Sequence, residues 1–259
     1  QGFWGGHRWE VRSAAKAEIV ERISPFVLRT DETELDMPEL IINDMWCQLP
    51  PAVQKQYNKL KRDLFLQLES TDVLVANAAS AFMKCKCLCN GSVYDETKQT
   101  HVVHDEKLSM LKELDEGLGG KPLLIFFQFK SDQDQILRAF PGTPVIDGES
   151  GKVTPEIVDG WNSGKYTRLL AQVRAASHGL NLQGGACTDV AFYGLPDSVE
   201  SYDQAFRRVY RQGVKGNHVR VHRLLVENTV DVVIRDRVDG KFKDQQDFLS
   251  ALKNHARPT

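Results

Sequence analysis

Two arginines in one short stretch carry the clearest chemical signal in the sequence. Residues 198–213 are SVESYDQAFRRVYRQG. On a helix, Gln204, Arg208 and Arg211 (i, i+4, i+7) line one face. The opposite face carries an apolar stripe: Val199, Tyr202, Ala205, Phe206 and Val209. The planar, permanently charged guanidinium suits phosphate recognition, so the pair would clamp a polyphosphate delivered by a neighbouring domain. The same spacing also fits the solvated polar face of an amphipathic helix.

A second stretch, residues 169–185, is LLAQVRAASHGLNLQGG. An apolar run leads into small residues, and Gly179 allows a backbone conformation or a close approach that a side chain would block. Such a turn can present backbone amides to a phosphate group, although a strand-to-helix turn with a packing glycine has the same pattern. His178 would act as a base or a ligand, or form a hydrogen bond within the loop.

Three closely spaced cysteines suggest a metal site at first sight. They are Cys85, Cys87 and Cys89, with His101 and His104 downstream. The C-x-C-x-C spacing is poor for tetrahedral zinc, and on a helix the three side chains point to different faces. We therefore expect no metal and interpret the cysteines as small apolar packing residues.

The composition is that of an ordinary globular protein. The chain has 259 residues, with 41% hydrophobic and 26% charged residues and a net charge of -2. A net charge this close to zero does not favour nucleic-acid binding by bulk charge, so any DNA contact should be local. No apolar run approaches the ~20 residues that a membrane span needs. We expect a cytoplasmic protein with reduced thiols, and a chain cut from something longer because its first residue is not Met.

The pattern of apolar residues divides the chain into two regions. In residues 1–118 we expect helices at 53–68 and 73–83, a loop at 90–104 and a further helix ending near Gly117. From residue 119 onward, strand-like and helix-like runs alternate. The expected strands are 123–127, 144–146, 168–173, 189–193 and 219–226, and the expected helices are 133–140, 155–162, 198–211 and parts of the chain after Thr229.

Repeated alternation of strand and helix predicts an α/β fold, a parallel sheet with helices on both faces. Ligands of such sheets gather at the carboxyl ends of the strands. The loops after Phe127, Val173 and Tyr193 are therefore the places to expect a site.

The ordered motifs resemble those of a known family. SHGLNLQGG, followed by FYGLPDSVESYDQAFRRVYRQG and then HVRVHRLLVENTVDVVIRD, is similar to motifs five and six of helicase superfamily two, and more narrowly to Swi/Snf-like translocases of phages and prophages. Upstream, LLIFFQFKSD resembles motif four, IDGES the short motif after it, and ISPFVLRTDETELDMPEL the segment joining the two motor lobes. The resemblance extends from about Ile23 to about Leu252.

The sequence also departs from that family. Thr30, Ser177 and Tyr210 stand where the family usually has a basic residue, a glycine and a histidine. No G-x-x-x-x-G-K-[ST] phosphate loop occurs, because Gly119, Gly120 and Lys121 lack the leading glycine and run into a proline. We therefore expect the first motor lobe to be missing and this chain alone to be inactive.

The resemblance implies a RecA-like second motor lobe of an ATP-dependent translocase on double-stranded DNA, with residues 1–118 as connecting helices and residues 119–259 as the lobe. ATP and Mg²⁺ would be bound mainly by the first lobe. The implied roles are arginine fingers at Arg208 and Arg211, coupling to the nucleotide at Gln204, Gly179, Asn181 and Gln183, and DNA contact at Gln128, Lys130 and Arg174.

Two other classes stay open at this stage. A stand-alone DNA-binding or regulatory module would keep the fold without ATPase activity. A Rossmann-like small-molecule enzyme is disfavoured because no G-x-G-x-x-G follows an expected strand. Trp4 and Trp9 would stack on bases or pack against a lobe.

Overall fold

The computed structural model describes residues 15–26, 37–69, 75–97, 99–148, 155–176 and 180–257. The chain divides into two compact units, residues 1–37 and residues 38–259. In the first unit, helix α1 (Ala15–Ile23) leads directly into the short 3-10 helix η1 (Ser24–Phe26). Trp4, Trp9 and Thr30 lie outside the described residues.

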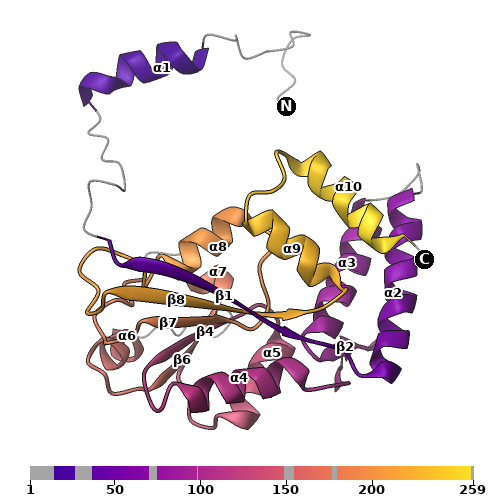
Figure 1. The fold of residues 1–259 in the computed structure, drawn as a ribbon, viewed down its shortest axis with the longest axis horizontal. Helices are drawn as coiled ribbons and strands as arrows, with labels where there is room; N and C mark the ends of the chain where they lie inside the picture. The colour runs from indigo at the N-terminus through magenta and orange to yellow at the C-terminus, as the bar shows by residue number, and fades with distance from the viewer. Residues whose placement is uncertain are drawn as a thin grey trace. The chain divides into compact units, whose positions relative to one another are not determined.

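The second unit is built on a six-stranded sheet in the order β1-β8-β7-β4-β6-β5 (Figure 1). Its strands are β1 (Glu39–Cys47), β4 (Leu123–Phe127), β5 (Val145–Ile146), β6 (Arg168–Gln172), β7 (Asp189–Phe192) and β8 (His218–Val226). Every neighbouring pair is parallel. The connections from β4 lead toward β5 and β6, whereas β7 continues to β8, so the strand order reverses between β4 and β7.

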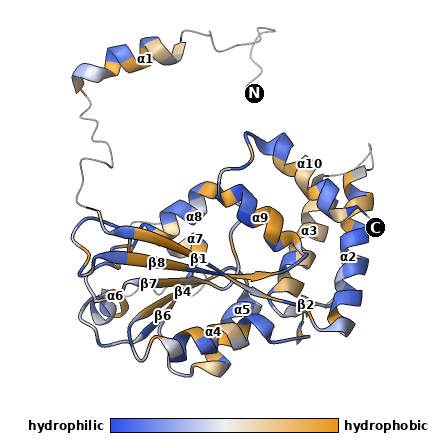
Figure 2. Cartoon of the chain, in the orientation of Figure 1, coloured by the Kyte–Doolittle hydropathy of each residue, from blue (hydrophilic) through white to orange (hydrophobic). Residues whose placement is uncertain are grey.

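Helices cover both faces of this sheet, as the sequence predicts. They are α2 (Pro51–Glu69), α3 (Val75–Cys89), α4 (Glu106–Gly117), α5 (Lys130–Ala139), α6 (Pro155–Asn162), α7 (Val173–Ala176), α8 (Val199–Phe206), α9 (Val230–Val238) and α10 (Gln245–Ala256). Alternate residues of β4 enter different cores: Leu124 and Phe126 pack with α8 and α9, and Ile125 packs with α4 and α5. A strand buried on both faces is a continuous apolar run, and Figure 2 shows the apolar centre of the sheet.

Three strands were not expected from the sequence. The edge strand β1 pairs with β8 along its whole length, from Glu39 opposite His218 to Cys47 opposite Val226, although it falls in the region expected to be connecting helices. The expected loop at 90–104 contains a small antiparallel hairpin of β2 (Ser92–Tyr94) and β3 (Thr100–Val102). The division between the two compact units lies after residue 37. Among the described helices, none has the length and apolar character that a bilayer crossing requires.

Candidate functional site

The end of α8 is fixed by a row of packed aromatic rings. The ring centroids of Phe192 (in β7) and Tyr202 lie 4.9 Å apart, those of Tyr202 and Phe206 5.2 Å apart, and those of Phe206 and Tyr210 6.0 Å apart. Tyr202 and Phe206 are buried. Aromatic pairs at these separations add stability beyond the area that they bury. The row therefore anchors the segment after α8 to the centre of the sheet.

The helix predicted for residues 198–211 is shorter than expected. It ends at Phe206, and the backbone continues as turns, with the amides of Arg208 and Val209 bonded three residues back, to Ala205 and Phe206. Val209 is fully buried, as the apolar stripe predicts. The alignment of Gln204, Arg208 and Arg211 on one helix face is wrong, because the helix ends before both arginines. Val199, expected in the apolar stripe, is 40% exposed.

The two arginines nevertheless lie close together in these turns. Burial lowers the pKa of Arg208, and the positive charge of Arg211 lowers it further. The Arg208 guanidinium Nη1 donates to the carbonyl oxygen of Leu180 at 3.4 Å. Arg211 is exposed and makes no hydrogen bond or ion pair with any described residue. We call residues 207–211 the arginine turn. The structure joins this turn to the loop after α7, although the two segments are separated in the sequence.

That loop, residues 180–185, is held against the end of α6. The indole nitrogen of Trp161 donates to the carbonyl of Leu182 at 3.0 Å, and Asn162 donates to the carbonyl of Asn181 at 2.9 Å. The Asn162 side-chain oxygen accepts from the amide of Gly184 at 3.0 Å. A Cβ on Gly184 would lie 2.9 Å from Asn162, so only glycine permits this approach. Three hydrogen bonds and a close backbone approach therefore hold the loop to α6.

Two side chains of the loop were predicted to couple nucleotide to DNA. The Asn181 side-chain oxygen accepts from the amide of Gln183 at 3.2 Å. The Gln183 side-chain oxygen is buried and accepts no hydrogen bond from the described residues. Gly179, with Ser177 and His178, lies outside the described residues. Gln204, the remaining coupling residue, donates to Glu200 at 2.9 Å on the exposed side of α8.

The place where the strand order reverses is filled by the protein itself. Gln128, directly after β4, donates to the carbonyls of Gly194 and Leu195 beyond β7, the first at 2.9 Å. Its side-chain oxygen accepts from Lys86 of α3, whose ammonium also lies 2.9 Å from Asp197. Every polar atom of the Gln128 side chain is thus engaged within the protein, so this residue positions two loops.

Beneath Gln128 lies a buried polar network that the sequence did not predict. Asn90 donates to Asp132 at 3.1 Å and accepts from Lys107 at 2.9 Å, and the Lys107 ammonium lies 2.7 Å from Asp231. Burial raises the pKa of Asp132 to about 6. The network joins the ends of α3 and β4 to the starts of α4, α5 and α9. The sequence places two lysines, Lys84 and Lys86, in the apolar run of α3, but only Lys86 is buried.

The side chains of the other two residues predicted to contact DNA are exposed. Lys130 is exposed at the start of α5, 3.8 Å from Asp134. Arg174 is exposed on α7. Both follow the carboxyl ends of strands, β4 and β6, where parallel sheets place their ligands.

Cys85, Cys87 and Cys89 are buried and carry free thiols. Burial raises the pKa of Cys85 and Cys87 to about 12. The two histidines are engaged elsewhere: His101 lies 2.7 Å from Asp95, and His104 lies 2.7 Å from the carbonyl of Leu88. In the part of the chain that the structure describes, no group of three histidines, cysteines or carboxylates is placed to hold a metal ion.

The comparison with protein families matches residues 106–213 to the helicase conserved C-terminal domain. Among curated proteins, the chain is 30% identical over 252 residues to a putative protein p41 of Acyrthosiphon pisum secondary endosymbiont phage 1, with 95% of this chain and 54% of that protein covered. It is 26% identical over 224 residues to an uncharacterized ATP-dependent helicase of Mycoplasma genitalium, with 83% of this chain and 21% of that protein covered. The chain therefore spans about half the length of the phage protein and a smaller share of the mycoplasmal one.

Solved structures share the fold. The C-terminal part of the Fun30 ATPase domain aligns with a TM-score of 0.61 at 13% identity, over 85% of this chain and 97% of that one. The Sulfolobus solfataricus SWI2/SNF2 ATPase core in complex with double-stranded DNA aligns with a TM-score of 0.55 at 21% identity, over 93% of this chain and 53% of that one. The sequence motifs, the parallel sheet and these matches agree: residues 106–213 match the helicase conserved C-terminal domain, and the chain has the RecA-like fold of a helicase C-terminal lobe.

Proposed function

We propose that this chain is the second motor lobe of an ATP-dependent translocase on double-stranded DNA. In this proposal Arg208 and Arg211 enter the interface with a first motor lobe and act there on the phosphates of ATP. The observation that carries the proposal is the contact between Arg208 and the carbonyl of Leu180, because it links the arginine turn to the loop of residues 180–185. The similarity to a phage protein supports a further part of the proposal, that the motor acts in the cytoplasm of a bacterial host.

The arginine pair suits a polyphosphate better than it suits solvent. Two like charges close together repel each other, and the lowered pKa of Arg208 reflects both its burial and that repulsion. A phosphate group between the two guanidiniums would replace the repulsion with charge-assisted hydrogen bonds. ATP supplies the phosphoryl group that is transferred to water. The arginines would stabilise the negative charge that develops on its oxygens. Mg²⁺ and the rest of the nucleotide would be held mainly by the first lobe.

The loop of residues 180–185 would report the state of the nucleotide to the DNA. Its backbone is fixed to Trp161 and Asn162 of α6 on one side and to Arg208 on the other. A movement of Arg208 on phosphate binding would therefore reach Asn181 and Gln183 directly. Gly179 precedes this loop and belongs to the same proposed unit. Gln204 would leave Glu200 and approach the nucleotide when the lobes close.

For DNA, the proposal rests on Lys130 and Arg174, with Gln128 holding the loops beneath them. Both cations are exposed beyond the carboxyl ends of neighbouring strands, β4 and β6. Contacts with phosphates fix position without reading sequence, as a motor that moves along any DNA requires. The Sulfolobus solfataricus core of similar fold was solved with double-stranded DNA. Opening and closing of the two lobes around ATP would then move the lobe along the duplex.

Displacement of a third strand tests translocation without strand separation. The chain joined to its first lobe should release a triplex-forming oligonucleotide from a duplex when ATP is supplied, and should leave the two strands of the duplex paired. The K130Q/R174Q variant should lose the displacement. Release of single strands from a plain duplex would instead identify a strand-separating helicase, and no displacement by the wild-type protein would refute translocation.

A further inference from the structure

Helix α2 lies outside the proposed motor site and has two very different faces. Val53, Tyr57 and Leu64 are buried in the core. The helical period of 3.6 residues places Lys55, Lys59 and Arg62 on the opposite face, since they follow one another at i, i+4 and i+7. All three are exposed. They form a straight basic stripe along the outside of the helix, and Figure 2 shows the hydrophilic character of α2.

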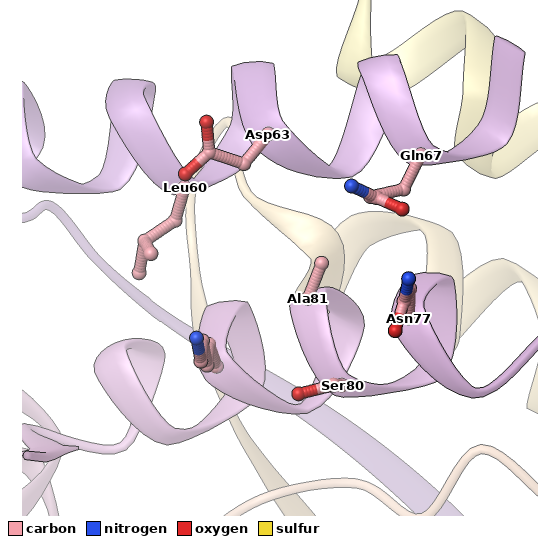
Figure 3. A pocket seen from close by; sticks show the side chains of 7 residues that line it. Leu60, Asp63, Gln67, Asn77, Ser80 and Ala81 are labelled. Atoms are coloured by element: carbon pink, nitrogen blue, oxygen red, sulfur yellow. The ribbon is translucent and has the colours of Figure 1, made fainter. Parts of the chain in front are cut away.

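The acidic residue in the middle of α2 does not neutralise this stripe. Asp63 lines a pocket between α2 and α3, together with Leu60 and Gln67 of the same helix (Figure 3). The side chains that face it come from α3: Asn77, Ser80, Ala81 and Lys84. Asp63 is exposed and one turn from Lys59, but it makes no ion pair with Lys59 or Arg62, so the three cations keep their charge unpaired within the described residues.

The three cations also lack the partners that other cations of this protein have. None of them makes an ion pair or hydrogen bond within the described parts of the chain. Elsewhere Arg168 pairs with Asp115 at 2.6 Å, and Arg223 pairs with Asp44. Like charges one turn apart repel each other and weaken a helix. An anionic partner lying along α2 would remove that repulsion.

We propose that this stripe binds the phosphate backbone of duplex DNA, at a surface separate from Arg208, Lys130 and Arg174. It rests on the proposed function only for the identity of the partner. From Lys55 to Arg62 the helix rises roughly 10 Å, and each strand of duplex DNA carries one phosphate per ~3.4 Å measured along the duplex axis. Three cations on one helix face thus meet a dense, regular array of phosphate charge. The stripe would keep the lobe on DNA while the motor contacts are released.

The salt dependence of DNA binding tests this surface. Binding of the complete chain to a fluorescent duplex of about 20 base pairs is measured by anisotropy between about 50 and 200 mM salt. The test variant is K55Q/K59Q/R62Q. The matched control, K112Q/K121Q/K243Q, removes the same charge from exposed lysines of other segments. The K130Q/R174Q variant reports on the proposed motor contacts.

Loss of three phosphate contacts should reduce the slope of log affinity against log salt by about 2.7. Between 50 and 200 mM salt, the factor by which the affinity falls should therefore be about 40 times smaller for the test variant than for the wild type. The control should keep the wild-type slope. If the test variant keeps the wild-type slope while K130Q/R174Q lowers it, the α2 surface is refuted and the motor contacts stand. If the control falls as far as the test variant, the effect is one of total charge and α2 has no special role. Absence of any binding by the wild type overturns both proposals.

Discussion

Replacing Arg211 with alanine is expected to lower DNA-stimulated ATP hydrolysis by about 10³-fold or more in the motor joined to its first lobe. The guanidinium would act on charge that develops only in the transition state, so kcat should fall while the affinity for DNA stays close to that of the wild type. Arg211 is the sharper test of the pair because it is exposed and makes no hydrogen bond or ion pair with the described residues, whereas Arg208 also donates to Leu180. Steady-state hydrolysis at saturating DNA measures the effect.

A nearby cation provides the control for that experiment. Lys215 is exposed in the same stretch of chain, and K215A should hydrolyse ATP at nearly the wild-type rate. R211K keeps the charge but loses the planar fork, so its rate should lie between those of the wild type and R211A. Hydrolysis by R211A within about tenfold of the wild type would be too small a loss for an arginine finger and would remove Arg211 from the site.

Replacing Lys107 with methionine is expected to destabilise the fold by about 3–5 kcal/mol, because it leaves a buried carboxylate without its partner. The Lys107 side chain is 0% exposed and that of Asp231 is 4% exposed, and their charged atoms lie 2.7 Å apart. Burial opposes the charge of Lys107, but the attraction of Asp231 outweighs it and the pKa of the lysine is raised. The free energy of unfolding in urea measures the loss.

Two further variants separate lost charge pairing from lost packing. K112M changes an exposed lysine of the same helix and should alter stability by no more than about 0.5 kcal/mol. In K107M/D231N the buried carboxylate is gone, so part of the lost stability should return. The pair would be no determinant of stability if K107M cost less than about 1 kcal/mol, and the charge argument would fail if the double variant were no more stable than K107M.

The central strands could be predicted because their burial leaves a local trace. Leu123–Phe127 is apolar at every position since both of its faces are covered. β1 lies at the edge of the sheet, and its partly exposed residues alternate only loosely, so its place beside β8 depends on residues far away in the chain. The end of α8 at Phe206 was missed because the apolar stripe continues at helical spacing to Val209, which is buried although it lies beyond the helix.

The candidate site could likewise be predicted only where the signal is local in the sequence. The types of Arg208 and Arg211 and their distance in sequence were enough to propose phosphate contact, and the structure brings Arg208 to the predicted loop at Leu180. The role of Gln128 could not be derived in this way. Its partners, Lys86 and Gly194, come from other elements. The pairing of Lys107 with Asp231 likewise joins residues far apart in the sequence, and no spacing rule connects them.

The most direct test of a nucleotide site shared between two lobes is DNA-stimulated ATP hydrolysis. It is measured for this chain, for a separately produced first lobe, and for a mixture of the two. We expect little hydrolysis by either part and DNA-stimulated turnover in the mixture, which R211A abolishes. Hydrolysis by this chain alone would contradict a shared site, because the nucleotide site would then lie within one lobe and not between two.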